Sequence, residues 1–433
     1  MNDLESLAFY GGSKAVVKPL PHFAWGSPTK NQIKALANYI DNKGDMSIYG
    51  DSGIYRTLES KIEEQYEVKY CIATNTGTSA LNSGYFGIKV NPGDEVIVPS
   101  YTFLATVTPL LRLGAIPVFA DSDPLTGNIS PKDIERKITK RTVAIAITHM
   151  WGVPCAMDEI MKIKKRYGLK LLEDCSHAHF TMYKGKLLGT FGEVACFSIG
   201  AKKTWTSGEG GFLITNDPEC FIRATFLGHF EERAKDALKR IRDDGFKKVF
   251  SKYSNFISGY GENYRMHPYS AVMALAFLER DFFDVIKKRR ESLKYMTKKL
   301  KAVDGIEAPF LPDDFFTGAM YGYKPRIQIE RLRLKIPFEK LISVIQAENI
   351  KIKLPDTLCL HENPLFTSKN NHYNKGNGFA GVKIKGSFSG VNSYFNGRVS
   401  MPAFSSGLKK DKDIIDQYCV GLNKVLAIAD KLR

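Results

Sequence analysis

Short apolar runs alternate with amphipathic segments between about residues 50 and 215, and this alternation constrains the fold more than any other feature. The run TVAIAITHMWG, at residues 142–152, has almost no alternation of apolar and polar side chains, so a strand there is buried on both faces. The segment MDEIMKIKKRYG, at residues 157–168, instead has the spacing of an amphipathic helix. Strands and helices that alternate in this way predict an α/β fold, with a mostly parallel sheet covered by helices.

Further stretches have the same rhythm, and two strands around a turn close the series at residues 196–215. Ligands of such sheets bind beyond the carboxyl ends of the strands. The residues that directly follow each apolar run are therefore the candidates for a functional site. They are residues 75–79, 99–103, 149–152 and 174–179.

The pattern also predicts a division of the chain into parts. Residues 1–45 form an N-terminal arm with a helix, residues 46–285 a large domain, and residues 286–433 a smaller C-terminal α+β domain. The charged segment 230–255 has no clear apolar face and is predicted to be a surface excursion. The polar, Gly-rich stretch 367–390 is predicted to be a long loop or insertion.

Composition excludes several classes of protein. The seven cysteines are scattered and form no C-x-x-C motif, which argues against a disulfide framework or a zinc site and for a reducing cytoplasm. No apolar run is long enough to span a membrane, and the N-terminus lacks the pattern of a signal peptide.

The chain has 62 basic against 46 acidic residues, a net charge of +16 that invites nucleic acid as a partner. Much of this excess lies in segments such as 281–303, where a solvated helix face explains it. Since no nucleic-acid-binding motif accompanies the charge, we expect no nucleic-acid partner. A small anionic substrate, such as a sugar nucleotide, also suits a basic surface.

The motif NTGTSAL places Gly77 where a strand turns into a helix, with Thr78 and Ser79 in the first turn. A helix N-terminus offers free N–H groups and the positive end of a dipole, and hydroxyl groups add donors. The motif is therefore a candidate phosphate site. A plain capped helix explains the same residues, because Thr and Ser are common caps.

Two other strand ends carry candidate groups. Asp174 ends a buried strand, where a carboxylate needs a cationic or hydrogen-bonding partner, and it is either a structural or a functional group. His177 and His179 follow, but His-x-His without further ligands is weak evidence for a metal, and we expect none. Phe103 is either a core aromatic or a platform for stacking.

The adjacent lysines Lys202 and Lys203 lie between two apolar runs and before the glycines of SGEGG. Neighbouring side chains of an extended segment point to opposite sides, so only one of the two faces a given pocket. A poorly solvated lysine loses its proton more easily and attacks carbonyl groups. The glycines match neither a P-loop nor a dinucleotide motif, and GNGFAG at residues 376–381 matches the latter outside any βαβ unit.

Together these signals supply a phosphate site, an aromatic plate, a buried carboxylate and an amine nucleophile. A cofactor with a phosphate, a flat ring, a ring nitrogen and an aldehyde uses all four. Pyridoxal 5′-phosphate is such a cofactor.

The blocks NTGTSAL, GDEVIVPSYTFLAT, LLEDCSHAH, CFSIGAKKTWTSGEGGFLITND and GENYRM resemble the DegT/DnrJ/EryC1/StrS family of PLP-dependent, fold-type I sugar aminotransferases. Counting from the family's serine and from its GEGG glycines, the resemblance assigns the Schiff-base lysine to Lys203 and makes Lys202 a bystander. It implies phosphate contacts from Thr78, Ser79 and Ser198. It further implies that Phe103 stacks on the pyridine ring and that Asp174 pairs with the ring nitrogen.

The resemblance implies further contacts. Asn263 matches an asparagine that reaches the phosphate of the neighbouring subunit's cofactor, which implies a homodimer with shared sites. Arg265 lies in the same loop and is a candidate substrate contact, as is His361 in TLCLHENPLF. The chain departs from the family at His177, where glutamine is common near the cofactor's phenolic oxygen, although histidine can form the same hydrogen bond.

The implied reaction moves an amino group from glutamate or glutamine to a ketosugar, a nucleotide-linked ketosugar or a keto-cyclitol, in amino-sugar, polysaccharide or antibiotic biosynthesis. Lys203 transfers the proton, and Asp174 keeps the pyridine nitrogen protonated. One alternative is a sugar dehydratase of the same family, which replaces the lysine with histidine. Another is a regulator that binds the cofactor without turnover. The sequence leaves the acceptor, the aminated carbon and the amino donor open.

Overall fold

The structure is a computed structural model of the 433-residue chain. It describes residues 3–18, 27–46, 53–200, 202–254, 259–310, 320–355, 357, 359–368 and 381–432. Residues 369–380 of the predicted loop lie outside the described residues, as does all of the motif 376–381 except Gly381.

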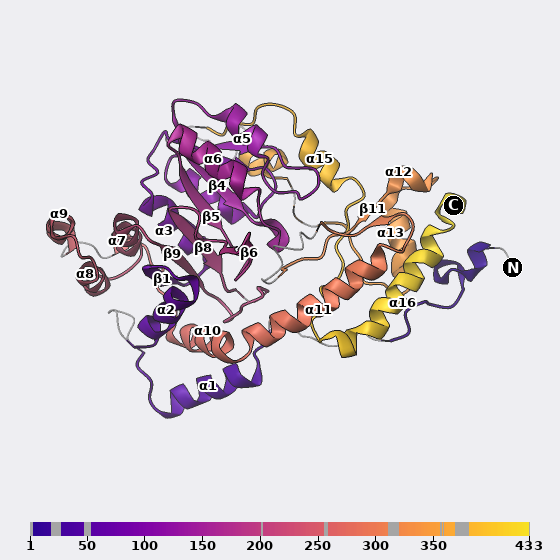
Figure 1. Cartoon of the computed structure of the whole chain (residues 1–433), viewed down its shortest axis with the longest axis horizontal. Coiled ribbons are helices and arrows are strands. Elements are labelled where there is room, and N and C mark those ends of the chain that lie inside the picture. Colours follow the sequence, from indigo (N-terminus) through magenta and orange to yellow (C-terminus); the bar gives the residue numbers. More distant parts are fainter. Residues whose placement is uncertain are drawn as a thin grey trace.

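A sheet of seven strands, in the order β1-β9-β8-β5-β4-β2-β3, forms the centre of the large domain (Figure 1). All neighbouring strands are parallel except at β9, which is antiparallel to both β1 and β8. Its strands are almost entirely buried, as the lack of alternation in residues 142–152 predicts. The strands are β1 (Tyr70–Thr74), β2 (Glu95–Pro99), β3 (Ile116–Ala120), β4 (Thr142–Thr148), β5 (Lys170–Asp174), β8 (Val194–Ser198) and β9 (Gly211–Thr215).

Helices cover both faces of this sheet and bury a separate apolar core on each. One core receives side chains from α2 (Gly53–Tyr66), α5 (Pro131–Lys137), α6 (Met157–Tyr167) and α10 (Pro268–Arg280). The other receives them from α3 (Gly77–Gly87), α4 (Thr108–Arg112) and α7 (Pro218–Phe226). The predicted three-layer α/β architecture is therefore confirmed.

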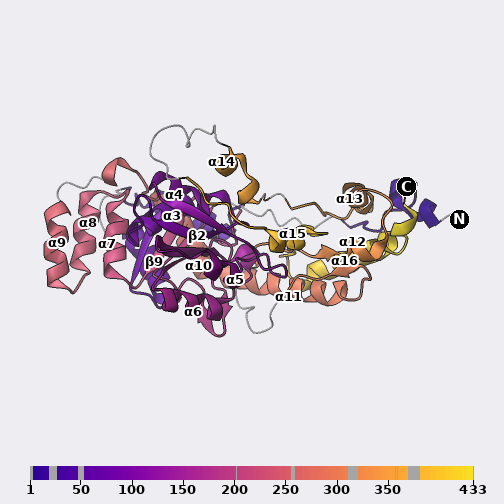
Figure 2. The same ribbon diagram turned by 90° about the horizontal axis from the view of Figure 1, so that it is seen from above.

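The charged segment 230–255, predicted to be a surface excursion, contains two helices, α8 (Glu231–Lys239) and α9 (Asp244–Ser254). They stack outward from α7 at the end of the molecule opposite both termini (Figure 2). The prediction that it has no apolar face is wrong for α8, which buries Ala234, Ala237 and Leu238. The ion pair between Arg233 and Glu59, at 2.5 Å, also ties α8 to α2.

The long helix α11 (Phe282–Leu300) leads from the large domain into the small one, where it packs beside α16 (Leu408–Leu426) (Figure 1). Leu7 and Val16 of the N-terminal arm belong to the same core. Other elements of this half are β10 (Ile306–Glu307), β11 (Arg326–Ile327), α12 (Ile329–Leu332) and α13 (Phe338–Ala347). The arm's remaining helix, α1 (Lys30–Asp41), instead packs on α10 of the large domain.

Residues 359–368 and 381–395 pack against the large domain, which a boundary at residue 286 does not anticipate. They contain α14 (Pro364–Thr367) and α15 (Ser389–Phe395) and contribute to the core that α3 and α7 build. The Lys383 backbone exchanges hydrogen bonds with Pro117 and Phe119 of β3. This segment therefore covers the edge strand of the sheet, which otherwise exposes unpaired backbone groups.

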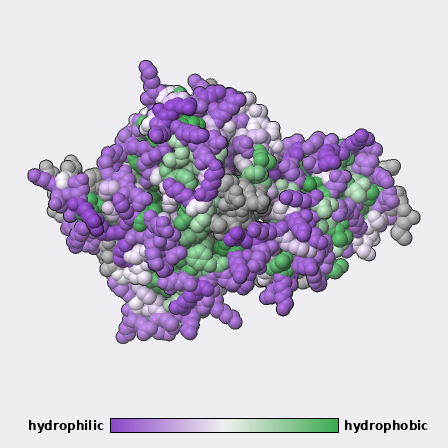
Figure 3. Space-filling view, in the orientation of Figure 1, coloured by the Kyte–Doolittle hydropathy of each residue, from purple (hydrophilic) through white to green (hydrophobic). Residues whose placement is uncertain are grey.

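The face of the molecule in Figure 3 is mostly hydrophilic, with hydrophobic side chains gathered around the middle of the large-domain half. Among the helices of the described residues, none combines the length and the apolar character that crossing a membrane requires. The short hairpin of β6 (Met182–Tyr183) and β7 (Lys186–Leu187) completes the strands of the large domain.

Candidate active site

A cavity of about 1290 Å³ lies at the carboxyl ends of the parallel strands, where segments of the small domain close it. Its walls come from the turns after β1, β2, β4, β5 and β8 and from residues near 321–324 and 400–406. The rule that ligands bind beyond the carboxyl ends of parallel strands therefore predicted the position of the cavity correctly. The predicted site residues that line it are Gly77, Thr78, Phe103, Asp174, His177, Ser198 and Lys203.

The turn from β1 to α3 opens into this cavity. Thr76 is the N-cap of α3 and accepts a hydrogen bond from the Ser79 N–H at 3.1 Å. The Ser79 hydroxyl donates to the Asn75 side chain at 2.6 Å, and Ser79 does not line the cavity as the described residues define it. Thr76 thus caps the helix, Asn75 holds the Ser79 hydroxyl, and a phosphate contact from Ser79 remains a prediction. Thr76 lines the cavity and was missed, although the N-cap preference for Thr was the available signal.

Gly77 brings the start of α3 unusually close to the end of β8. A Cβ atom at Gly77 would lie 2.5 Å from the Ser198 Cβ, and one at Gly211 would lie 2.5 Å from the Gly77 nitrogen. Glycine is therefore required at both positions. The close approach places the Ser198 hydroxyl beside the N-terminus of α3, and this combination of donors fits a phosphate group.

Asp174 ends β5 with its carboxylate almost fully buried, at 3% exposure. One oxygen accepts a hydrogen bond from the Thr106 hydroxyl at 2.7 Å, and the other accepts one from the Ser176 N–H at 3.1 Å. These two bonds hold the carboxylate at the cavity wall, where it fits a protonated ring nitrogen of a ligand.

His177 lies in a group of parallel aromatic rings. Its ring centre is 4.1 Å from that of Tyr321 and 5.4 Å from that of Trp151. Burial, with the positive charge of Lys203 next in importance, holds the His177 pKa well below its usual value, so the imidazole is neutral. Its Nδ1 accepts a hydrogen bond from the Trp151 N–H at 3.4 Å, which leaves the proton on Nε2.

Trp151 joins the two domains at this group of rings, and neither Trp151 nor Tyr321 was singled out from the sequence. The Trp151 carbonyl accepts hydrogen bonds from the N–H groups of Tyr321 at 3.0 Å and Gly322 at 3.3 Å. Trp151 has a φ of 59°, a conformation that non-glycine residues adopt rarely and that is often found at functional sites. The only sequence signal was the position of Trp151 just after a strand.

The two lysines lie in a turn that follows β8. The Lys203 N–H donates to the Gly200 carbonyl at 2.9 Å, so the segment is not extended and the expected strand alternation is wrong. Both side chains line the cavity, yet Lys202 is exposed and Lys203 is partly buried. Burial lowers the Lys203 pKa to about 8, against the opposing effect of the Asp174 carboxylate. Burial rather than alternation therefore distinguishes Lys203 from Lys202.

Phe103 is 63% exposed and lines the cavity after β2. Its interpretation as a core aromatic is therefore wrong, and its accessible ring fits the role of a plate on which a flat ligand stacks. The Lys203 Nζ lies 4.7 Å from the centre of the Tyr321 ring, so aromatic surface also adjoins this amine.

Besides Ser79, three predicted residues do not line the cavity in the described part of the chain. Asn263 is exposed, and its carbonyl accepts a hydrogen bond from Asn75 at 3.0 Å, just outside the turn that starts α3. The Arg265 guanidinium lies over the Phe230 ring at 3.8 Å. His361 is buried and stacks on Phe388, with ring centres 3.7 Å apart. Contacts of Asn263, Arg265 and His361 with cofactor or substrate remain predictions.

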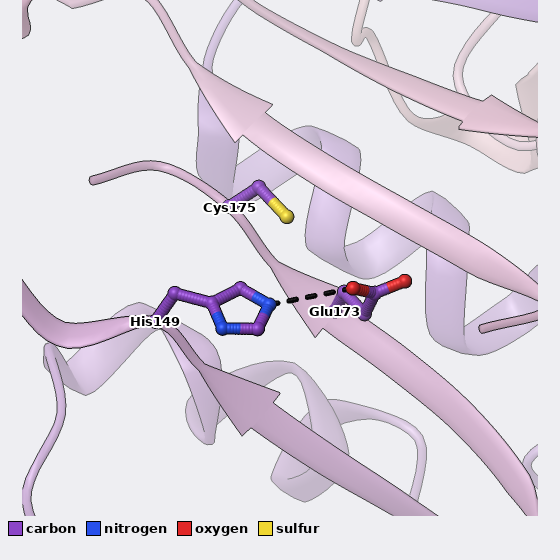
Figure 4. Close-up of side chains that lie close together, drawn as sticks. All are labelled: His149, Glu173 and Cys175. Carbon is purple, nitrogen blue, oxygen red and sulfur yellow. Dashed lines mark hydrogen bonds and ion pairs between the residues drawn. The ribbon is translucent and has the colours of Figure 1, made fainter. Parts of the chain in front are cut away.

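Behind the cavity, one group of described residues has the composition of a metal site: His149, Glu173 and Cys175 (Figure 4). Glu173 accepts hydrogen bonds from the N–H groups of Gly189, Phe191 and Gly192 at 2.8–2.9 Å and lies 3.3 Å from His149 Nε2. His149 Nδ1 accepts from the Cys155 N–H, and burial raises the Cys175 pKa well above its usual value. These bonds tie β4, β5 and the following loop together.

Comparison with known proteins places this geometry in context. A model of the DegT/DnrJ/EryC1/StrS aminotransferase family matches residues 29–377. GDP-perosamine synthase of Escherichia coli O157:H7 is 36% identical over 275 residues, which cover 61% of this chain and 71% of that protein. The L-glutamine:2-deoxy-scyllo-inosose aminotransferase of Streptomyces paromomycinus is 35% identical over 226 residues, covering 51% of this chain and 53% of that protein.

The solved structure of an aminotransferase from Psychrobacter cryohalolentis is similar over 94% of this chain and 99% of that one, with a TM-score of 0.79 and 24% sequence identity. At this identity the similarity concerns the fold, and it confirms the fold class predicted from the sequence.

Proposed function

The chain belongs to the DegT/DnrJ/EryC1/StrS aminotransferase family, and we propose that it transfers an amino group from glutamate or glutamine to a ketosugar, a nucleotide-linked ketosugar or a keto-cyclitol. The proposed cofactor is pyridoxal 5′-phosphate. One observation carries the proposal: the partly buried amine of Lys203, with its pKa lowered to about 8, lies in the cavity whose walls include Asp174 and the N-terminus of α3. The relatives supply the substrate classes, since one is named for GDP-perosamine and one for an inosose.

Each part of the cofactor has residues that fit it. Gly77, Thr78 and Ser198 would hold its phosphate through N–H and hydroxyl groups at the positive end of α3. Phe103 would stack on its ring. When bound, pyridoxal phosphate supplies an aldehyde carbon for the amine and a ring that withdraws electrons from the substrate's α-carbon.

Lys203 has the proton-transfer role. An amine with a pKa of about 8 is partly neutral near neutral pH, so Lys203 Nζ can accept a proton from a substrate carbon and later return it to another carbon. Asp174, held by Thr106 and Ser176, would keep a proton on the ring nitrogen. The neutral His177 would donate its Nε2 proton to the cofactor's phenolic oxygen.

The proposal includes a homodimer with shared sites, acting in the cytoplasm. Support for the dimer is the exposed position of Asn263 just outside the start of α3, where it is available to a second copy. Support for the compartment is that each of the seven cysteines, all of them described, is buried and free. Chemical crosslinking and sedimentation test the dimer, and an Asn263→Ala variant with unchanged cofactor affinity would argue against sharing.

The test uses the purified protein loaded with pyridoxal phosphate. Glutamate or glutamine should convert the bound cofactor to pyridoxamine phosphate, and a panel of free and nucleotide-linked ketosugars and keto-cyclitols should then yield an amine detectable by mass spectrometry. Failure of every amino donor to convert the cofactor would favour a binding protein. A sugar product that has lost a hydroxyl group without gaining nitrogen would favour the dehydratase.

A further inference from the structure

Three chain segments of the small domain lie side by side where this domain faces the cavity. Tyr323 pairs with Met401 and Arg326 with Arg398 in antiparallel bridges, so Lys324 lies opposite Ser400. Ser400 in turn pairs with Lys353, and the two residues exchange backbone hydrogen bonds of 2.7 and 3.1 Å. Lys324, Ser400 and Lys353 therefore form one row across three segments, and residues directly opposite each other present their side chains on the same face.

All three side chains of this row line the cavity. Lys324 and Ser400 are each 7% exposed, and the Lys324 Nζ donates a hydrogen bond to the Ser400 hydroxyl. The same Nζ lies 3.7 Å from the centre of the Trp151 ring. Lys353 is exposed at the end of the row.

The position of Lys324 is set by close packing. A Cβ atom at Gly322 would lie 2.4 Å from the Trp151 ring, so only glycine allows this segment to pass so close to it. Burial of an ammonium group costs free energy unless the group is paired, so a lysine is an expensive residue at this position. The positive charge of Lys324 also contributes to the lowering of the His177 pKa. The electrostatic effect of Lys324 therefore reaches the side chains at the centre of the site.

We propose that Lys324, Ser400 and Lys353 form a subsite for an oxyanion of a substrate, either a carboxylate or a phosphate. Two ammonium groups that flank a hydroxyl offer the charge-assisted donors that such groups bind. This subsite lies on the small-domain wall, separate from the donors at Gly77 and Ser198 that fit the cofactor phosphate. The inference deepens the proposed function and rests on it, since the oxyanion is carried by the amino donor or by the acceptor.

The test measures anion binding to the enzyme loaded with pyridoxal phosphate, so that the cofactor phosphate occupies its own site. Calorimetric titrations with succinate and with inorganic pyrophosphate represent the two sources. We expect at least one of them to bind, and Lys324→Gln and Lys353→Gln each to raise its dissociation constant about tenfold or more. Lys324→Arg should restore most of the affinity, because it retains the charge.

Lys335→Gln removes an exposed lysine of the same domain outside the cavity and should leave the dissociation constants unchanged. Because the Lys353 side chain is exposed, Lys353→Gln should fold normally, so weaker anion binding by this variant would not result from misfolding. Weakened succinate binding assigns the subsite to the donor, and weakened pyrophosphate binding assigns it to the acceptor. Unchanged affinity for both anions in both Gln variants, or no binding of either anion to the wild-type enzyme, would overturn the inference.

The dissociation constants do not depend on turnover, so the subsite and the proposed function can fail separately. An inactive wild-type enzyme that still binds an anion through Lys324 would count against the function alone. An active enzyme whose Gln variants bind both anions normally would count against the subsite alone.

Discussion

Glu173 and Asp174 are consecutive carboxylates at the end of β5, and their side chains serve opposite sides of the sheet. Glu173 is fully buried and accepts hydrogen bonds from three backbone N–H groups, with His149 beside it (Figure 4). Asp174 is nearly as buried, yet it lines the cavity. Burial alone therefore does not separate a structural carboxylate from one that is proposed to be functional. The difference lies in whether the carboxylate is available to a ligand.

The same contrast extends to the groups around them. Asp174, His177 and Lys203 meet at the cavity wall. Behind it, His149 and Glu173 bond to each other and to the backbone, and Cys175 lies beside them. We therefore expect substitutions on the cavity side to reduce catalysis and leave stability nearly unchanged. Substitutions behind the cavity should reduce stability and leave catalysis nearly unchanged.

The largest effect is expected from Lys203→Ala, with Lys202→Ala as its matched control. Loss of the proton-transferring amine should lower kcat by about a thousandfold or more. The first variant should also show no covalently bound cofactor after borohydride reduction and peptide mass spectrometry. Lys202 is exposed, so Lys202→Ala should keep the wild-type kcat and the covalently bound cofactor. Reversed results would show that the two lysines have been assigned the wrong way round.

Asp174→Asn should have the next largest effect. The amide can still accept the Thr106 hydroxyl, so the fold should persist, but the charge that keeps the ring nitrogen protonated is lost. We expect kcat to fall roughly a hundredfold with a melting temperature close to that of the wild type. Steady-state kinetics and thermal unfolding measure the two quantities. A nearly unchanged kcat would remove Asp174 from the mechanism.

Glu173→Gln tests the other side of the same strand. A glutamine presents its own N–H groups to the backbone N–H groups that the carboxylate now accepts from, so part of the network loses its acceptor. We expect the free energy of unfolding to fall by about 3 kcal/mol. The kcat per folded molecule, corrected by a count of bound cofactor, should stay within about twofold. A stable variant with low kcat would contradict the division between the two sides.

The smallest effect is a shift in a pH profile. Only the neutral amine of Lys203 attacks an aldehyde, so the rate at which the apoenzyme takes up pyridoxal phosphate covalently should rise with pH and level off above about 8. Because the Asp174 carboxylate raises the Lys203 pKa, Asp174→Asn should move the midpoint to lower pH. Stopped-flow absorbance measures this profile, and Glu173→Gln is the control that should leave it in place. A midpoint near the ordinary lysine pKa would mean that Lys203 is not desolvated.

Much of the fold and part of the site follow from local sequence patterns. The apolar run of β4 and the periodic spacing of α6 each reflect the burial that one segment needs, so both were predicted from a few neighbouring residues. The start of α3 at Gly77 depends on residues within one helical turn. The strand-end rule and the family resemblance then sufficed to predict Asp174 and Lys203.

The tertiary structure decided what depends on residues far apart in the chain. Trp151 meets Tyr321 and Lys324 only because the small domain folds back over the sheet, and no local pattern marks such a contact. The difference between Lys202 and Lys203 arises from a turn and from burial by other segments, whereas a local rule predicted an extended strand. The sequence alone thus determined the elements and several of their end groups, because these depend on local periodicity. Packing between segments that are distant in sequence decided which of the side chains at the strand ends face the cavity.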